Sequence, residues 1–99
     1  MKTPIFKFKS KVWLYAGPTT WHFVTVPREQ SEQIKFHGAE KMAGWGSIRM
    51  HVTIGKTEWD TSVFPEKRTG CYILPLKAAV RKAENISDDD TITVSLKIA

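Results

Sequence analysis

Residues of the types that most often carry catalysis are few in this 99-residue chain and lie far apart along it. Cys71 is the single cysteine and opens a short apolar segment after Gly70. A reactive thiol needs a neighbouring base or cation, so the pattern favours a packed, inert side chain. Ser62 lies in the strand-like stretch DTSVF and not in a G-x-S-x-G turn. The sequence therefore predicts no catalytic residue.

Metal-binding side chains lack the spacing that a site would need. No H-x-H or H-x-x-x-H pair occurs among the three histidines, which are His22, His37 and His51. Glu58 and Asp60 alternate on one strand face, where a carboxylate pair could serve acid–base chemistry. Such a pair is more often an exposed face that meets lysines of a neighbouring strand. The acidic run at 88–90 lacks calcium-loop spacing, so neither a metal nor a cofactor is predicted.

Basic residues at alternating positions are the stronger functional signal. The net charge is +5, and residues 1–28 contain no acid. Such a surface attracts nucleic acid, although a solvated face that keeps a small protein soluble explains it too. The candidate binding residues on outward strand positions are Lys7, Lys9, Lys11, Arg49 and Lys97.

Trp45 is a further candidate binding residue, because it stands between Gly44 and Gly46 in a loop-like stretch. An aromatic side chain flanked by glycines can stack on a ligand. It can also plug one end of a barrel, and we favour the plug because aromatic residues mostly serve packing.

Hydrophobic periodicity predicts a chain made mainly of strands, joined by Gly- and Pro-containing turns. We expect strands at 6–14, 21–26, 47–54, 57–64, 71–74 and 91–98. Weak helical character covers 28–36, and a second helix follows Pro75. In that second helix the apolar positions recur at helical spacing and predict a stripe facing the core, made by Leu76, Ala79, Val80 and Ala83.

The order of elements repeats along the chain. A strand, a second strand, a proline, a helix and a third strand occur once with Pro27 and once with Pro75. This pattern predicts one domain over residues 1–99, built from a pseudo-repeat at 5–54 and 55–98. Two such halves would close a barrel around a pseudo-twofold axis, with one helix at each end. The alternative is that the repeated order of elements arises by chance in an ordinary mixed β fold.

The overall composition is that of a soluble globular protein, with 41% hydrophobic and 25% charged residues. The N-terminal stretch lacks the apolar region and the cleavage site of a signal peptide. No apolar run approaches the ~18 residues of a membrane span. We therefore expect a cytoplasmic protein, and a monomer, because a chain that closes its own barrel need not dimerise.

Several long motifs resemble domain-of-unknown-function family 1905, from about Phe6 to Leu96: WHFVTVP, GWGSI, TIGKTEWDTSVFP and YILPLKAAVRKA. The resemblance implies a mainly β fold, α+β by content. It is a six- to seven-stranded double-split β-barrel capped by two short helices, distantly like AbrB- and MazE-type transcription factors. Some longer members carry a second domain called YdeI/OmpD-associated. Members usually have a Gly-Asp pair before the final strand, where this chain has Asp89-Asp90. Asp tolerates positive φ better than most residues, so the turn should survive.

Two hypotheses of function follow. The first is a non-catalytic binding module whose partner is a small molecule or another protein. The second is a nucleic-acid-binding protein that uses a basic strand face, although a shared fold does not by itself confer function. An enzyme ranks third, because no catalytic constellation appears in the sequence.

Overall fold

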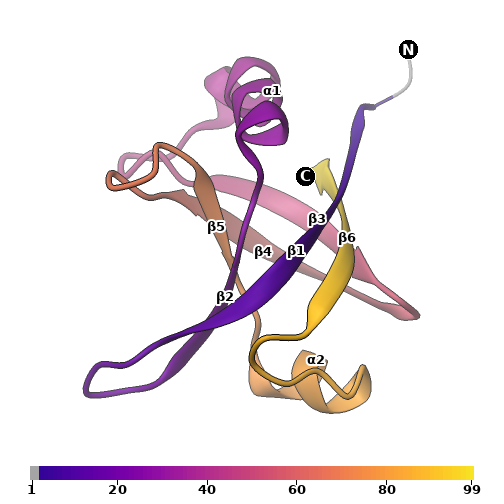
Figure 1. Ribbon diagram of the computed structural model, residues 1–99. Coiled ribbons are helices and arrows are strands. Elements are labelled where there is room, and N and C mark those ends of the chain that lie inside the picture. The colour runs from indigo at the N-terminus through magenta and orange to yellow at the C-terminus, as the bar shows by residue number, and fades with distance from the viewer. Residues whose placement is uncertain (1–2) are drawn as a thin grey trace.

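Six strands close into an antiparallel barrel in the order β1-β2-β5-β4-β3-β6, and two helices cap it (Figure 1). The computed structural model describes residues 3–99. The strands are β1 (Ile5–Tyr15), β2 (Trp21–Thr25), β3 (Ile48–Ile54), β4 (Thr57–Pro65), β5 (Tyr72–Pro75) and β6 (Thr91–Ile98). This confirms the expected mainly β barrel with two short helices.

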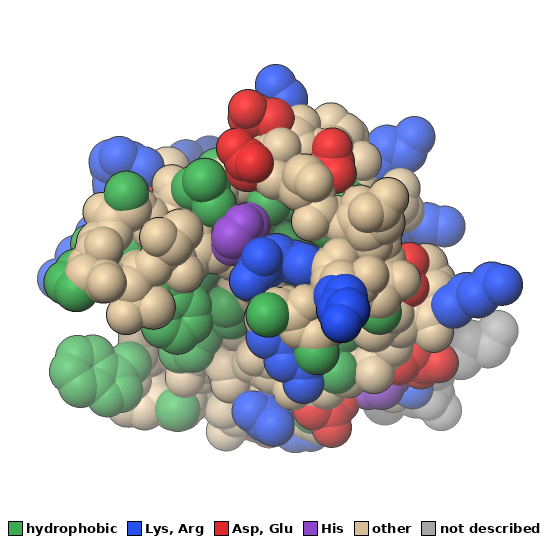
Figure 2. All heavy atoms as spheres, turned by 90° about the horizontal axis from the view of Figure 1, so that it is seen from below, with side chains coloured by type: hydrophobic (Ala, Val, Ile, Leu, Met, Phe, Trp, Pro, Cys, Tyr) green, Lys and Arg blue, Asp and Glu red, His purple; other side chains and the backbone are tan. Residues whose placement is uncertain are grey.

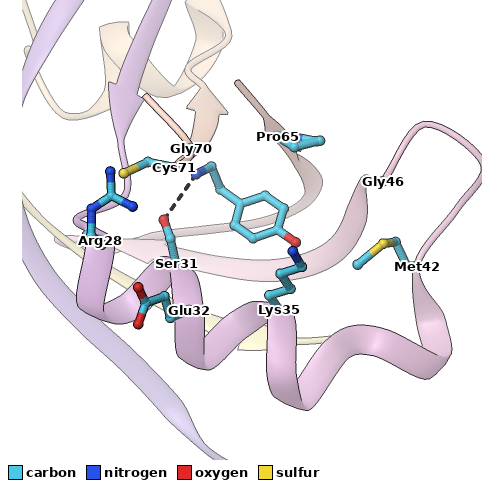
Figure 3. A pocket seen from close by; sticks show the side chains of 10 residues that line it. Arg28, Ser31, Glu32, Lys35, Met42, Gly46, Pro65, Gly70 and Cys71 are labelled. Carbon is cyan, nitrogen blue, oxygen red and sulfur yellow. Dashed lines mark hydrogen bonds between the residues drawn. The ribbon is translucent and has the colours of Figure 1, made fainter. Parts of the chain in front are cut away.

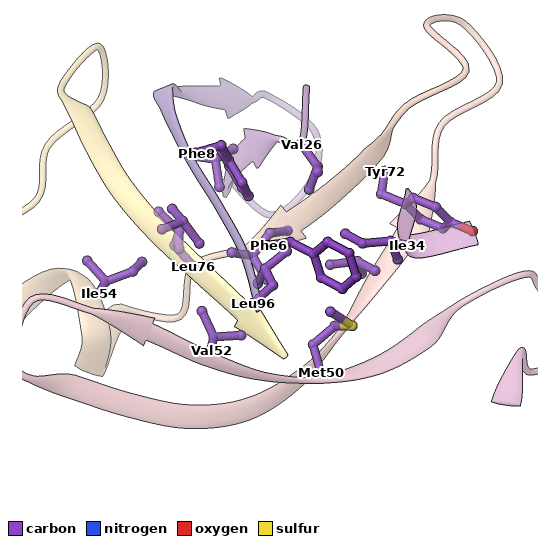
Figure 4. Packing of buried hydrophobic residues seen from close by; sticks show 14 of the residues in the cluster. Phe6, Phe8, Val26, Ile34, Met50, Val52, Ile54, Tyr72, Leu76 and Leu96 are labelled. Carbon is purple, nitrogen blue, oxygen red and sulfur yellow. The ribbon is translucent and has the colours of Figure 1, made fainter. Parts of the chain in front are cut away.

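Alternation along each strand builds the core. Phe6, Phe8 and Val12 of β1 point inward and are at most 6% exposed, together with Val94 and Leu96 of β6. Figure 4 shows how side chains from opposite strands meet in the barrel interior. Every second residue points inward because successive side chains of a strand point to opposite faces of the sheet.

Leu14 has the same strand parity as Phe6, Phe8 and Val12, which predicts an inward side chain, but it is 43% exposed. The register explains the difference. The β1–β6 ladder ends at Lys11↔Thr91, whereas the β1–β2 ladder continues to Tyr15↔Trp21. The β1–β2 hairpin therefore projects beyond the barrel, as Figure 1 shows, and its last inward position has no core to face.

The strand order has an internal symmetry. Exchanging β1, β2 and β3 with β4, β5 and β6 leaves the closed order β1-β2-β5-β4-β3-β6 unchanged. Each set of three strands also contains one helix before its last strand. Two similar halves related by a pseudo-twofold axis would produce this arrangement.

Helix α1 (Arg28–Gly38) closes one end of the barrel and continues into a short 3-10 helix, η1 (Ala39–Lys41). Its anchor residues are Ile34, which is fully buried, and Ser31, which is 3% exposed. The Ser31 hydroxyl donates to the Val26 carbonyl oxygen at 2.9 Å and accepts from the Tyr72 amide at 3.0 Å. One side chain thus joins α1 to the end of β2 and the start of β5.

Helix α2 (Ala78–Ala83) is shorter than expected and begins three residues after Pro75. Leu76 and Val80 are buried, as the stripe predicted, but Ala79 and Ala83 are exposed. The prediction was wrong for these two alanines, because Leu76 precedes the helix and a six-residue helix makes fewer than two turns, too few for a buried stripe.

The turn of the β3–β4 hairpin packs against the C-terminal end of α2. Gly55 has φ +58, and a Cβ at that position would lie 2.0 Å from an oxygen of Glu84, the residue that caps α2. The Thr57 hydroxyl donates to the same carboxylate. Glycine is therefore needed both for the left-handed turn conformation and for the close approach of Glu84.

The turn before β6 confirms the expectation for Asp89, which takes φ +68. Asp90 stabilises the turn by accepting a hydrogen bond from the Ser87 amide on its side-chain oxygen at 2.8 Å. The backbone groups of both aspartates bond to Val12 of β1. The acidic turn therefore continues the β1–β6 ladder.

Candidate functional site

Three lysines form a line on the outer face of β1. Lys7, Lys9 and Lys11 are all exposed and occupy alternate positions opposite the buried phenylalanines. We call these three residues the lysine line. In the β1–β6 register they lie opposite Ser95, Thr93 and Thr91, none of which is acidic. No ion pair within residues 3–99 uses any of the three ammonium groups.

Arg49 and Lys97 lie on the same outer sheet face, but in different electrostatic surroundings. Lys97 pairs by register with Ile5 on one side and His51 on the other, and Arg49 is two residues from His51 on β3. His51 in turn lies opposite Asp60 of β4. The register therefore puts all five predicted basic residues at outward positions of the barrel, and Glu58 and Asp60 of β4 lie nearer to Arg49 and Lys97 than to the lysine line.

His51 bridges the two carboxylates that the sequence singled out. Its Nδ1 lies 2.7 Å from an oxygen of Asp60, and its Nε2 lies 2.8 Å from an oxygen of Glu58. The expectation that lysines of a neighbouring strand would pair with these acids was wrong, because the β3–β4 hairpin brings a histidine there. The hydrogen bonds that the protonated ring donates to Glu58 and, to a lesser degree, to Asp60 raise the pKa of His51 above 6.5.

Trp45 is 90% exposed, so the interpretation that it plugs the barrel was wrong. The loop that carries it leaves the barrel after η1, and the end of the barrel is filled by α1 side chains instead. Its neighbour Gly46 has φ +82 and lies against Pro65. Ligand stacking by Trp45 stays a prediction.

A cavity of about 370 Å³ lies between α1 and the segment that leads into β5 (Figure 3). Its floor includes Cys71 and Tyr72, and its rim carries Arg28, Glu32 and Lys35 of α1. Cys71 is 8% exposed, as expected for a packed thiol. Burial raises the pKa of the Tyr72 hydroxyl. Two cations beside one carboxylate give this cavity a weak preference for anions.

His22 is the other perturbed histidine, and it lies at the α2 end of the barrel. Its Nδ1 is buried without a hydrogen-bond partner among the described residues. Burial, and then the positive charge of Arg81, lower the pKa of His22, while Asp88 opposes the shift. The ring is therefore held neutral more strongly than an exposed imidazole.

Aromatic side chains extend the lysine line at the other end of β1, and this feature was missed from the sequence. Trp13 and Tyr15 have the same outward parity as the three lysines, and the register places Phe23 and Trp21 of β2 directly opposite them. We call these four residues the aromatic platform. Tyr15 is 55% exposed and Trp21 is 50% exposed. Their odd-numbered spacing was visible in the sequence, but whether another element covers this face was not.

The rings of the aromatic platform pack against one another. The centroids of Trp13 and Phe23 are 5.1 Å apart, and Trp21 stacks on Phe23 at 6.0 Å with planes 10° apart. The Trp13 indole Nε1 donates to the Thr25 hydroxyl at 3.0 Å, which fixes its ring. Three of the four rings thus contact one another directly, and Trp13 is also held by a hydrogen bond.

Two adjoining hollows lie over the platform, of about 280 and 380 Å³. Both are lined by Trp21, Phe23 and Ile73, and the larger reaches Phe64 and Pro75. Figure 2 shows hydrophobic side chains gathered on the left of the end view, the side where Figure 1 has the β1–β2 hairpin and β5. Contiguous exposed apolar side chains of this kind make the platform a candidate binding face.

Neither a metal cluster nor a membrane helix is found in residues 3–99. No group of three or more His, Cys, Asp or Glu side chains in this part of the chain is arranged to hold a metal ion. Within the same residues, no helix has the length and apolar character to cross a membrane.

Comparison with known proteins places the chain in a family. No curated protein matches it. The model of one family, described as Domain of unknown function (DUF1905), matches residues 8–96, which span all six strands and both helices apart from the ends of β1 and β6. The chain therefore belongs to the DUF1905 family.

Proposed function

We propose that this protein is a non-catalytic binding module for nucleic acid, and that the lysine line is its phosphate-contacting surface. The observation that carries the proposal is the placement of Lys7, Lys9 and Lys11 in one exposed row beside a strand that presents no acid to them. An uncompensated row of ammonium groups attracts a polyanion.

The spacing of the lysine line suits an extended backbone. Alternate residues of a strand are about 6.6 Å apart, so three ammonium groups repeat along about 13 Å. A chain of phosphates offers charges at regular intervals and can meet all three at once. A single small anion would meet only one or two.

The other predicted basic residues contribute less in this proposal. Arg49 lies diagonally across the β3–β4 ladder from Asp60, and Lys97 is separated from Asp60 only by His51, so these carboxylates oppose a phosphate there more than at the lysine line. We therefore assign the phosphate contacts to the lysine line and leave Arg49, Lys97 and Trp45 as secondary candidates.

Fluorescence anisotropy with labelled oligonucleotides tests the proposal. Three phosphate contacts give a slope of log K against log salt of about −2.1 for a single strand and about −2.7 for a duplex, so tenfold more salt lowers affinity about 100- to 500-fold. A variant with Lys7→Gln, Lys9→Gln and Lys11→Gln should lose about two units of that slope, because three ammonium groups no longer release counterions.

A matched control removes the same charge elsewhere, with Lys56→Gln, Lys67→Gln and Lys82→Gln at three exposed positions. This control should weaken binding through net charge alone and keep most of the salt slope. If neither the single strand nor the duplex binds at low salt, the proposal is contradicted. Equal salt slopes in the two triple variants would do so as well.

A further inference from the structure

We infer that the protein selects single-stranded nucleic acid, with unpaired bases stacked on the aromatic platform while the phosphates follow the lysine line. This inference rests on the proposed function and adds the class of ligand. It is carried by a separate observation, the aromatic platform, in which Tyr15 and Trp21 are exposed and Trp13 and Phe23 are half-buried beside them.

Continuity along β1 is the first step. The strand presents Lys7, Lys9, Lys11, Trp13 and Tyr15 outward in sequence, so charge and aromatic surface follow one another along the same strand. The eight residue steps from Lys7 to Tyr15 span about 26 Å. Single-strand-binding surfaces combine a basic track for the backbone with aromatic side chains for successive bases, and they cover about 4–16 nucleotides per domain.

The accessibility of base faces is the second step. Within a duplex each base is covered by its neighbours, and only its edges reach the grooves. Unpaired bases expose a flat apolar face that can stack on an aromatic ring. The hollows over Trp21, Phe23 and Ile73 are open to such a face, and their walls are mostly apolar.

The position of the nearest carboxylates is the third step. Glu66 lines the smaller hollow, and the acidic turn that contains Asp89 follows the β1–β6 ladder past Lys11. The acidic turn disfavours phosphate beyond Lys11, whereas Glu66 adds less repulsion because Arg68 lies 3.9 Å from its carboxylate. The lysine line, by contrast, attracts phosphate. This charge arrangement orients the strand, with its backbone over the lysines and its uncharged bases over the rings.

Competition between a single strand and a duplex of the same sequence tests the inference. We expect the unlabelled single strand of about 12 nucleotides to displace the labelled one at least tenfold more effectively than the duplex does. Trp21→Ala should weaken single-strand binding about 5- to 150-fold, as loss of one stacked base does, and leave duplex binding within about twofold. Trp21→Phe should keep most of the affinity, because a ring remains, whereas Trp21→Leu should behave like Trp21→Ala.

Phe36→Ala is the matched control, since Phe36 is 80% exposed on α1, at the opposite end of the molecule from the β1–β2 hairpin (Figure 1). This substitution should change neither the affinity for the single strand nor that for the duplex. Chemical shifts of the Trp21 indole N–H on titration with the single strand give a readout that does not depend on a variant, and they should move.

The inference fails if duplex and single strand bind equally, or if Trp21→Ala leaves single-strand affinity unchanged, as expected for a platform that docks another protein. If this happens while the lysine variant still loses its salt slope, the proposed function stands and only the class of ligand is wrong. If the lysine variant also behaves like its control, the proposed function itself is wrong.

Discussion

Ser31 connects three elements through one buried hydroxyl, and its removal should destabilise the protein strongly. Ser31→Ala takes away the partner of the Val26 carbonyl oxygen and that of the Tyr72 amide, and these residues are 0% and 5% exposed. A buried polar group left without a partner costs about 1–3 kcal/mol. The cavity beside α1 lets water approach this site and recover part of the loss. We therefore expect the free energy of unfolding to fall by about 2–3 kcal/mol.

Urea unfolding followed by tryptophan fluorescence measures this change. The midpoint should fall while the slope of free energy against urea stays the same, because the surface exposed on unfolding does not change. In a thermal scan the loss corresponds to a Tm lower by about 10–20 °C. Ser10→Ala is the control, because Ser10 is half-buried and its hydroxyl makes a single bond, to the Thr25 carbonyl oxygen. It should cost about 1 kcal/mol. A Ser31→Ala variant no less stable than Ser10→Ala would refute the reasoning.

Two further predictions concern the β3–β4 hairpin. The folded pKa of His51 exceeds its unfolded value near 6.5, so its contribution to stability is complete below 6.5 and is lost as pH rises through the folded pKa. NMR titration of the ring should show this raised pKa, and replacing both partner carboxylates with amides should return it toward 6.5; an unchanged pKa in that variant would show that the hydrogen bonds are not the cause. Gly55→Ala should lower the free energy of unfolding by about 1–2 kcal/mol through its positive φ alone, and by more if Glu84 cannot move away from the new Cβ. Gly44→Ala, which meets nothing within 4 Å, should be nearly neutral in the same urea assay, and equal losses in the two variants would contradict the explanation.

Local patterns in the sequence were enough to place most strands and turns. The alternation of Ile48, Met50, Val52 and Ile54 set both the bounds of β3 and its inward face, and all four are buried. This alternation depends on neighbours in the chain, so spacing alone reveals it. The positive φ of Asp89, by contrast, was expected from the family resemblance together with the tolerance of Asp for that conformation.

The candidate site was only half visible before the tertiary structure was known. The lysine line was found because Lys7, Lys9 and Lys11 alternate within one strand. Trp13 and Tyr15 share that alternation, but outward parity does not tell whether another element covers a face. Helix α2 gave a similar error, because helical spacing predicted a buried stripe that a six-residue helix does not form.

The sequence by itself determined which side of each strand is apolar, where the chain turns, and to which family it belongs. The tertiary structure alone decided that β2 pairs with β1 and β5, so that Phe23 and Trp21 lie beside Trp13 and Tyr15 on an uncovered face. It also decided that the loop carrying Trp45 stays outside the barrel. The physical reason is that strand order and the covering of a face depend on contacts between residues far apart in the chain, which a local pattern does not encode.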